Sequence, residues 1–241
     1  MNQPAKPLTE DQIEEFYREG YIVVEQLLPH DVIDAVVGEA RKVPTNADGS
    51  WTPRCFDFDK PLAEPSLHQC LAHENVVSAV EQIFETKARA YFGMLAVVKA
   101  GGGKGLPWHQ DNQYDQVIGR ALNTFVALCD ITPDKGILWV APCTHLLGTQ
   151  PSKEAANNHR EAVVEPEGGR PLAVLKKGDV CIFDRNTYHR SLKNDTNEDR
   201  YAYAAQYVEE NARYVKNGGK KDLAKPQARE LQALFERSAA V

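Results

Sequence analysis

The chain has 241 residues, of which 42% are hydrophobic and 26% charged, a composition typical of a globular protein with one large domain or two small ones. Its formal net charge of −6 gives no electrostatic reason to expect nucleic acid or an anionic membrane as a partner. No apolar run approaches the roughly 18–20 residues of a membrane-spanning helix, and we expect no secretory signal because the first residues lack an apolar core.

The first third of the chain is predicted to be mostly helical. Thr9 is followed three residues later by Gln12, the capping-box pattern of a helix start, and Gly20 marks the end of that helix. A long loop begins near Pro44, and loops of this length often carry function. The predicted elements are a helix over 8–20, a β-rich run over 21–28, a helix from 31, a loop over 44–66 and a helix over 74–84.

From Tyr91 onward the chain consists of short β-rich runs separated by turn residues. Helices followed by many evenly spaced short strands predict one mainly β domain, a sandwich or barrel with flanking helices. We expect this single domain to span 1–241, with N-terminal helices over 8–85, a core over about 90–208 and a helical tail over 210–241. The tail, most helix-prone around 222–237, is expected to dock on the core or to join two chains, so we expect a monomer or a homodimer.

The five cysteines are odd in number and widely scattered, and three of them lie in apolar stretches. This pattern is typical of free thiols in a reducing cytoplasm rather than of a disulfide framework. Four histidines have no partner at ligand spacing and are expected at the surface: His30, His68, His73 and His159.

The densest chemical signal is the sequence Trp-His-Gln-Asp at 108–111, on a predicted strand. Successive side chains of a strand point to opposite faces, so His109 and Asp111 share one face. A third ligand must come from elsewhere, and His189, just after the apolar run 180–183, is the best candidate. Two imidazoles and one carboxylate with open positions beside them suit a non-haem Fe(II) that activates O₂. A His-x-Asp pattern also occurs by chance, so this interpretation depends on the residues around it.

Arg200 lies eleven residues beyond His189 and opens a strand over 200–208. The period of two places Arg200 with Ala202, Ala204 and Gln206 on one face and three tyrosines on the other. One cation followed by two small residues describes a pocket wall with room for a ligand, and arginine grips a carboxylate bidentately. Ser191 shares the face of His189 and is placed to donate its hydroxyl to the same carboxylate. Taken alone, Arg200 is more readily explained as a surface residue.

With these residues in place, the chain resembles the phytanoyl-CoA dioxygenase (PhyH) family of Fe(II)/2-oxoglutarate oxygenases. The similarity extends over about residues 8–208 and rests on five pieces of sequence. These are the N-terminal run 8–28, the WHQD strand, GILWVAPCTH at 136–145, Lys-Gly-Asp at 177–179 before a strand, and His-Arg-Ser at 189–191 with Arg200 eleven residues past the histidine. The chain departs from the family at 142–145, where Pro-Gly-Ser-His is replaced by Pro-Cys-Thr-His, in a structural turn rather than at the metal site.

The resemblance implies a double-stranded β-helix (jelly-roll, cupin-like) core. By position, His109, Asp111 and His189 match the catalytic metal triad, Arg200 matches the anchor of the distal 2-oxoglutarate carboxylate, and Ser191 its helper. The resemblance also suggests a 2-oxoglutarate contact for Lys99, for which a solvated lysine is nearly as good an interpretation. Because Asp111 is present where related halogenases carry a small residue, halogenation is not expected.

Four further residues are candidates for the substrate site. Asn123 faces the same way as Phe125 and is expected to line the pocket. Tyr114 and Trp139 are placed to stack on a substrate, although core packing explains each aromatic equally well. Arg54 lies in the long proline-bearing loop, the kind of segment that covers a substrate.

The sequence therefore predicts a dioxygenase that uses Fe(II), 2-oxoglutarate and O₂ and hydroxylates a small-molecule metabolite or natural-product intermediate, with release of succinate and CO₂. Desaturation and ring formation on the same scaffold stay open. The alternative is a Zn or Mn jelly-roll hydrolase or isomerase with the same His/Asp/His triad, since these ligands also suit zinc with bound water. Arg200 argues against it, because a hydrolase has no obvious use for this cation. A non-catalytic metal-dependent binding module is a third interpretation. An acyl-CoA substrate would favour a basic cluster for its phosphates, and Lys104 stands alone in that respect.

Overall fold

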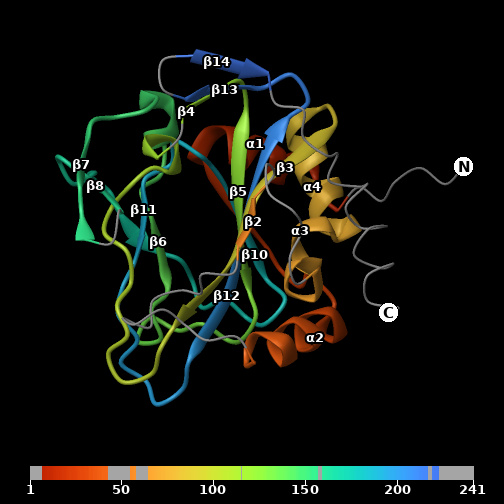
Figure 1. Cartoon of the computed structure of the whole chain (residues 1–241), viewed down its shortest axis with the longest axis vertical. Coiled ribbons are helices and arrows are strands. Elements are labelled where there is room, and N and C mark those ends of the chain that lie inside the picture. Colours follow the sequence, from red (N-terminus) through yellow and green to blue (C-terminus); the bar gives the residue numbers. More distant parts are fainter. Residues whose placement is uncertain are drawn as a thin grey trace, which may run out of the picture.

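The computed structural model describes residues 7–42, 55–57, 65–114, 116–156, 159–216 and 219–222 (Figure 1). Within these ranges no helix is both long enough and apolar enough to cross a membrane. The predicted substrate residue Arg54, most of the proline-bearing loop and the predicted helix over 222–237 lie outside the described residues.

Two antiparallel sheets form the jelly-roll core. The larger has six strands in the order β1 (Tyr21–Val24), β10 (Val180–Asp184), β5 (Ala121–Ala127), β12 (Arg200–Glu209), β3 (Ala88–Val98) and β2 (Cys55–Asp57). The smaller has three strands in the order β11 (His189–Ser191), β6 (Leu138–Val140) and β9 (Arg170–Pro171). Two small sheets complete the strands, β4 (Gln116–Ile118) with β13 (Arg213–Lys216) and β14 (Gly219–Asp222), and β7 (Ser152–Glu154) with β8 (Arg160–Ala162).

Helices cover one face of the six-stranded sheet (Figure 1). Alternate residues of the sheet, such as Ile182 and Tyr203, point to this face and join the helices in the largest apolar cluster. Burying these side chains stabilises the fold by roughly 25 cal/mol per Å² of apolar area. The helices are α1 (Glu10–Glu19), α2 (His30–Ala40), α3 (Gln69–Ala72) and α4 (Glu74–Phe84).

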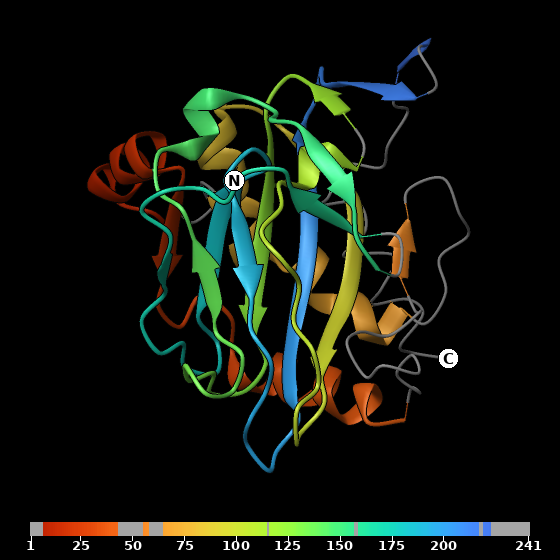
Figure 2. The same cartoon turned by 90° about the vertical axis from the view of Figure 1, so that its left-hand side faces the viewer.

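The opposite face of the six-stranded sheet looks toward the smaller sheet, and Figure 2 shows β6 and β11 in front of it. Here Phe125, Phe183 and Ala202 pack against Leu138 and Val140 in a second apolar cluster. Because both faces of the larger sheet are covered, its central strand β5 is buried at every residue. The interior between the two sheets is where His189 and Arg200 begin their strands.

The helices and most of the strands predicted from the sequence are confirmed. The capping box of α1 forms, with the Thr9 side chain accepting from the Gln12 amide and Gly20 in the left-handed region at φ 81°. The tail differs: 213–216 and 219–222 form a hairpin beside β4 instead of a helix. Tyr214 and Val215 favour a strand, and β4 offers them a partner edge. Charge-rich composition alone did not reveal that partner.

Candidate metal and cosubstrate site

His109 and His189 face each other across an antiparallel bridge. Each backbone N–H donates to the other's carbonyl oxygen at 3.0 Å, and the two ring centroids lie 4.2 Å apart. The carboxylate of Asp111 closes the group, with Oδ1 lying 3.5 Å from Nε2 of His109 and 3.8 Å from Nε2 of His189. One ligand atom from each of the three residues lies within 4.8 Å of the others. The structure thus brings together the three residues that the sequence pattern selected.

The local backbone around Asp111 differs from the predicted strand. Only an isolated bridge forms at His109, and Asp111 opens a 3-10 helix, η2 (Asp111–Gln113). Gln110 and Gln113 cap this turn reciprocally. The side chain of Gln110 accepts from the backbone N–H of Gln113, and the side chain of Gln113 accepts from the backbone N–H of Gln110. The strand predicted at 108–111 therefore does not extend beyond Gln110, because side-chain hydrogen bonds offer the backbone an alternative to a ladder. Asp111 still turns toward His109, by the curl of the 3-10 helix rather than by strand alternation.

Both imidazoles present the same nitrogen to the centre of the group. Nδ1 of His109 lies 2.7 Å from the carbonyl oxygen of Pro107, and Nδ1 of His189 lies 3.0 Å from that of Thr187. A carbonyl only accepts, so Nδ1 carries a proton in each ring and Nε2 is the nitrogen available to a metal ion. This second contact is the arrangement that orients metal-ligating histidines. The donor set therefore fits a divalent metal ion.

Burial and neighbouring charges give the group the protonation states that a metal needs. Burial, with His109 adding to it, lowers the pKa of His189 to about 4, so this imidazole is neutral at pH 7. Burial opposes ionisation of Asp111, but the polar contact with His109, the neighbouring imidazole of His189 and the Arg185 cation outweigh it and hold the pKa of Asp111 below its usual value. Neutral imidazoles and an ionised carboxylate are the forms that bind a metal.

A second buried histidine, His68, shows a similar pKa shift, although the sequence predicted it at the surface. It is 1% exposed, and its Nδ1 lies 2.6 Å from the hydroxyl of Tyr203. Burial lowers the pKa of His68 to about 4. The surface prediction for His68 was wrong because its burial comes from packing under β12, which no local pattern reports.

These two buried histidines predict that the metal-free protein loses stability as the pH falls from about 6.5 toward 4. The unfolded chain takes up these protons near pH 6.5 and the folded chain only near pH 4, so between these values protons favour the unfolded chain. At pH 5 the expected loss relative to pH 7 is about 2 kcal/mol per histidine. Urea unfolding at the two pH values measures it, and His68→Leu should remove about half. A free energy of unfolding that is unchanged or higher at pH 5 would contradict this account.

Arg200 is a buried cation on the interior face of β12. It is 2% exposed, its Nη1 donates to the carbonyl oxygen of Gly136 at 2.8 Å, and its guanidinium carbon lies 5.4 Å from the centre of the Phe125 ring. Its Nε has no hydrogen-bond partner, and among the described residues no carboxylate forms an ion pair with it. Burial lowers the pKa of Arg200 to about 10, which leaves it charged at pH 7. A buried charge of this kind is costly unless an anion joins it.

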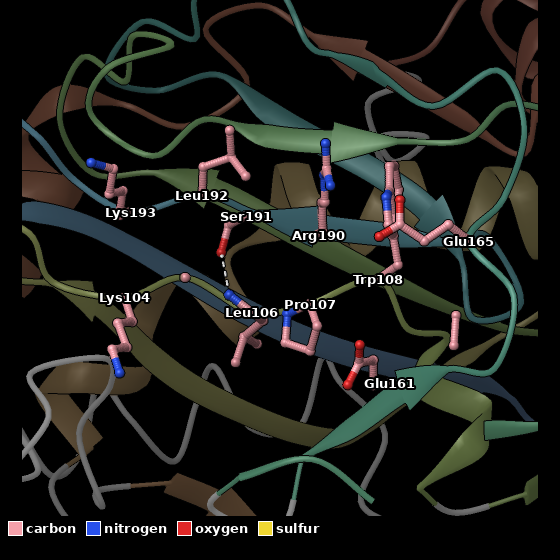
Figure 3. A pocket seen from close by; sticks show the side chains of 12 residues that line it. Lys104, Leu106, Pro107, Trp108, Glu161, Glu165, Arg190, Ser191, Leu192 and Lys193 are labelled. Atoms are coloured by element: carbon pink, nitrogen blue, oxygen red, sulfur yellow. Dashed lines mark hydrogen bonds between the residues drawn. The ribbon is translucent and has the colours of Figure 1, made fainter. Parts of the chain in front are cut away.

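The two predicted helpers of Arg200 lie in different surroundings. The Ser191 hydroxyl accepts from the backbone N–H of Leu106 at 3.2 Å, the contact drawn in Figure 3, and its own proton remains available to a ligand. The ammonium of Lys99 instead pairs with Asp199 at 2.7 Å and its side chain is 45% exposed. A cosubstrate contact by Lys99 would require that ion pair to open.

Asn123, in strand β5 of the larger sheet, lies close to the group formed by His109, Asp111 and His189. It is 2% exposed, and within the described part of the chain neither Nδ2 nor Oδ1 has a hydrogen-bond partner. On one side it is paired in register with Phe183, whose ring centre lies 4.7 Å from that of His189. On the other side it is paired with Gln206, which contacts Asp111. The predicted pocket residue thus offers a buried donor and a buried acceptor next to the triad.

The two aromatic candidates lie in different surroundings. The ring of Tyr114 lies edge-on to His109, with centroids 5.8 Å apart. Trp139 lies between the buried Leu138 and Val140 in β6 and is itself partly buried, and the guanidinium carbon of Arg190 lies 4.5 Å from the centre of its ring. Arg190 also lies 4.8 Å above the ring of Trp108. The structure therefore brings Tyr114 to the triad and Trp139 to a cation–π stack.

A pocket of about 330 Å³ opens beside Ser191 (Figure 3). Its charged lining residues are of both signs: Lys104, Lys193, Arg190, Glu161 and Glu165. Two carboxylates among three cations make it a poor receptor for a polyphosphate, whose binding needs a surplus of positive charge.

Sequence reasoning missed two residues that contact Asp111. Arg185 donates to its carbonyl oxygen at 2.9 Å, and Gln206 donates to its Oδ2 at 3.0 Å. The period of two had placed Gln206 on the face of Arg200 but gave it no role. A cation two residues past the apolar run 180–183 was the available signal for Arg185.

A jelly-roll whose interior holds two imidazoles and one carboxylate fits the class of non-haem iron oxygenases. A family model described as "Phytanoyl-CoA dioxygenase (PhyH)" matches residues 16–202, and the chain belongs to this family of 2-oxoglutarate-dependent enzymes.

Individual relatives agree with this membership. The "Ectoine dioxygenase" of Bordetella bronchiseptica is 23% identical over 222 residues, covering 79% of this chain and 72% of the relative. A crystal structure of EctD from S. alaskensis with 2-oxoglutarate and 5-hydroxyectoine is similar with a TM-score of 0.68 at 22% identity, covering 94% of this chain and 84% of the other. The epimerase SnoN in complex with Fe3+, alpha ketoglutarate and nogalamycin RO is similar with a TM-score of 0.70 at 18% identity, covering 90% and 94%. At these identities the solved structures support the fold.

Proposed function

We propose that the protein is an Fe(II)- and 2-oxoglutarate-dependent dioxygenase that hydroxylates a small-molecule metabolite or a natural-product intermediate and releases succinate and CO₂. The observation that carries the proposal is the pairing of two features in one interior: a donor set of two imidazoles and one carboxylate, and a buried arginine without a carboxylate partner among the described residues. A hydrolase or isomerase would use the first feature and has no evident use for the second.

In this proposal His109 and His189 hold Fe(II) through Nε2 and Asp111 holds it through its carboxylate. The carbonyls of Pro107 and Thr187 keep the two Nδ1 protons in place and so keep both Nε2 lone pairs directed at the ion. Bound Fe(II) would supply the O₂ chemistry, in which 2-oxoglutarate is oxidised along with the substrate. The protein residues supply orientation, charge and exclusion of water.

Arg200 would bind the distal carboxylate of 2-oxoglutarate. Its Nη1 is already held by Gly136, which fixes the plane of the guanidinium and leaves the remaining N–H groups for an anion. The Ser191 hydroxyl proton is a second donor for the same carboxylate. Binding the dianion would neutralise a cation that the folded protein otherwise buries at a cost.

Asn123 would hydrogen-bond a bound molecule beside the metal. An amide that is buried and has no hydrogen-bond partner within the described residues at either end costs free energy until a ligand pairs it. Because the amide offers one donor group and one acceptor, it selects a molecule with both kinds of atom, such as an amide, a hydroxyl or a protonated carboxyl. Tyr114 would form part of the same wall next to His109.

The substrate class follows from the site and from the relatives. Relatives are named for ectoine, or were crystallised with 5-hydroxyectoine or nogalamycin RO, all of them small molecules. The mixed charge of the pocket beside Ser191 gives no receptor for the phosphates of an acyl-CoA. We therefore propose a compact, polar substrate. The free thiols of Cys70 and Cys181 support the proposal that the enzyme acts in a reducing cytoplasm. We propose that it acts there as a monomer or a homodimer.

The proposed function is tested by succinate formation. Purified protein with Fe(II), 2-oxoglutarate, ascorbate and air is incubated with a panel of small polar metabolites, and succinate is quantified. We expect slow succinate release without substrate and a stimulation by at least one panel member that vanishes without iron. Tight metal binding with no iron-dependent succinate, with or without substrates, would overturn the proposal and favour the zinc or manganese alternative.

A further inference from the structure

A buried arginine and a glutamine lie directly behind the carboxylate of Asp111. Arg185, which follows β10 and is 1% exposed, donates from Nη1 to Oε1 of Gln206 at 3.1 Å and from Nη2 to the carbonyl oxygen of Asp111 at 2.9 Å. Gln206 in β12 donates from Nε2 to Oδ2 of Asp111 at 3.0 Å. Three hydrogen bonds thus link three segments into a closed ring.

The chemistry of this ring leaves only one orientation for the Gln206 amide. A guanidinium has donors and no acceptor, so the amide oxygen of Gln206 must face Arg185. An ionised carboxylate has acceptors and no donor, so the amide nitrogen must face Asp111. Arg185 therefore sets the direction in which Gln206 donates.

The ring occupies one oxygen of the carboxylate and leaves the other for the histidines. Oδ2 is bound by Gln206, whereas Oδ1 lies 3.5 Å and 3.8 Å from the Nε2 atoms of His109 and His189. Building on the proposed function, we infer that Arg185 and Gln206 are positioning residues that make Asp111 a one-oxygen metal ligand through Oδ1. A carboxylate that binds through one atom leaves a further coordination position for the cosubstrate or O₂.

The backbone of the same segments holds the ring in place. The N–H of Arg185 donates to the carbonyl oxygen of Ala121 at 3.1 Å, and the N–H of Asn112 donates to that of Arg185 at 3.3 Å. The side chain of Arg185 then returns to Asp111, so the start of η2 is fixed from both sides. A buried polar network whose hydrogen bonds converge on one carboxylate favours one geometry over several.

The test removes the Gln206 amide without changing the size of the side chain. Gln206→Met eliminates both of its hydrogen bonds and keeps Arg185. We expect the dissociation constant for Mn(II), read from the electron paramagnetic resonance signal of the free ion, to rise by about 10–100-fold, the usual cost of losing an outer contact to a ligand. The matched control is Gln82→Met, which loses the two amide hydrogen bonds to Leu8 far from the site. This control should bind Mn(II) as the unchanged protein does, even if both variants lose similar thermal stability.

A second pair of variants separates positioning from general packing. If Arg185 acts through Gln206, Arg185→Met and the double variant Arg185→Met/Gln206→Met should weaken Mn(II) binding to the same extent, because the two changes break one chain of contacts. Unchanged Mn(II) affinity in Gln206→Met would overturn the inference, and so would independent, multiplying losses in the double variant. Failure of the unchanged protein to bind Mn(II) would instead count against the proposed function itself.

Discussion

Replacing Asp111 by alanine is expected to weaken Fe(II) and Mn(II) binding by more than about 100-fold, beyond the usual cost of an outer contact. The change removes the only anionic member of the donor set, whose Oδ1 lies within 4 Å of both Nε2 atoms. Two neutral imidazoles alone hold a divalent ion much less firmly. Metal titration followed by magnetic resonance or calorimetry measures the loss, and iron-dependent succinate formation should fall with it.

A matched control shows whether the effect comes from losing a metal ligand or from losing any hydrogen-bonded carboxylate. Asp199 also accepts two hydrogen bonds, from Lys99 and from the backbone of Ala100, but it does not contact the histidines. Asp199→Ala should therefore bind the metal as the unchanged protein does. Equal metal affinity in Asp111→Ala and in the unchanged protein would show that the His/Asp/His group is not the metal site.

Replacing Arg200 by methionine is expected to raise the dissociation constant for 2-oxoglutarate by about 100–10,000-fold, because two charge-assisted hydrogen bonds of about 1.5–3 kcal/mol each are lost. Metal affinity should stay unchanged, since Arg200 bonds Gly136 and contacts Phe125 rather than any triad residue. Calorimetric titration of the Mn(II)-loaded protein with 2-oxoglutarate separates the two effects.

The same substitution is also expected to leave the ligand-free protein no less stable, which is unusual for a change at a buried residue. Arg200 is 2% exposed and among the described residues has no carboxylate partner, so the metal- and cosubstrate-free protein bears the cost of a buried charge. Arg200→Met should be at least as stable as the unchanged protein without ligands and should gain less from added 2-oxoglutarate. Arg200→Lys keeps the charge without the planar fork, and we expect intermediate cosubstrate affinity. A marked loss of stability in Arg200→Met would indicate a structural cation instead of a ligand anchor.

Much of the scaffold could be predicted from the sequence because its signals are local. The capping box at Thr9 and the apolar period of 74–84 each define a helix within a dozen residues, and both form. The alternation along 200–208 also holds, with Tyr203 toward the helices and Ala202 toward the interior. Resemblance to a family supplied the spacing of the triad and Arg200, and the structure brings His109, Asp111 and His189 together.

The rest depends on contacts between segments distant in the chain. The ring of Arg185, Gln206 and Asp111 joins residues up to 95 positions apart, and no local pattern marks it. His68 is buried by Tyr203, 135 positions away. The contact of Trp139 with Arg190 follows from the pairing of β6 with β11, which sets these two residues opposite each other. A sequence pattern fixes which residues share a face, but only the packed sheets decide which face is the interior.

The visible spectrum of the protein with Fe(II) and 2-oxoglutarate under argon tests the central claim most directly. The account predicts a weak metal-to-ligand charge-transfer band that requires both additions, is absent in Asp111→Ala, and needs far more 2-oxoglutarate in Arg200→Met. Such a band would mean that the cosubstrate chelates the metal at the His109, Asp111 and His189 group. Tight metal binding with no band at any 2-oxoglutarate concentration would contradict the account and assign the site to a metal enzyme of another class.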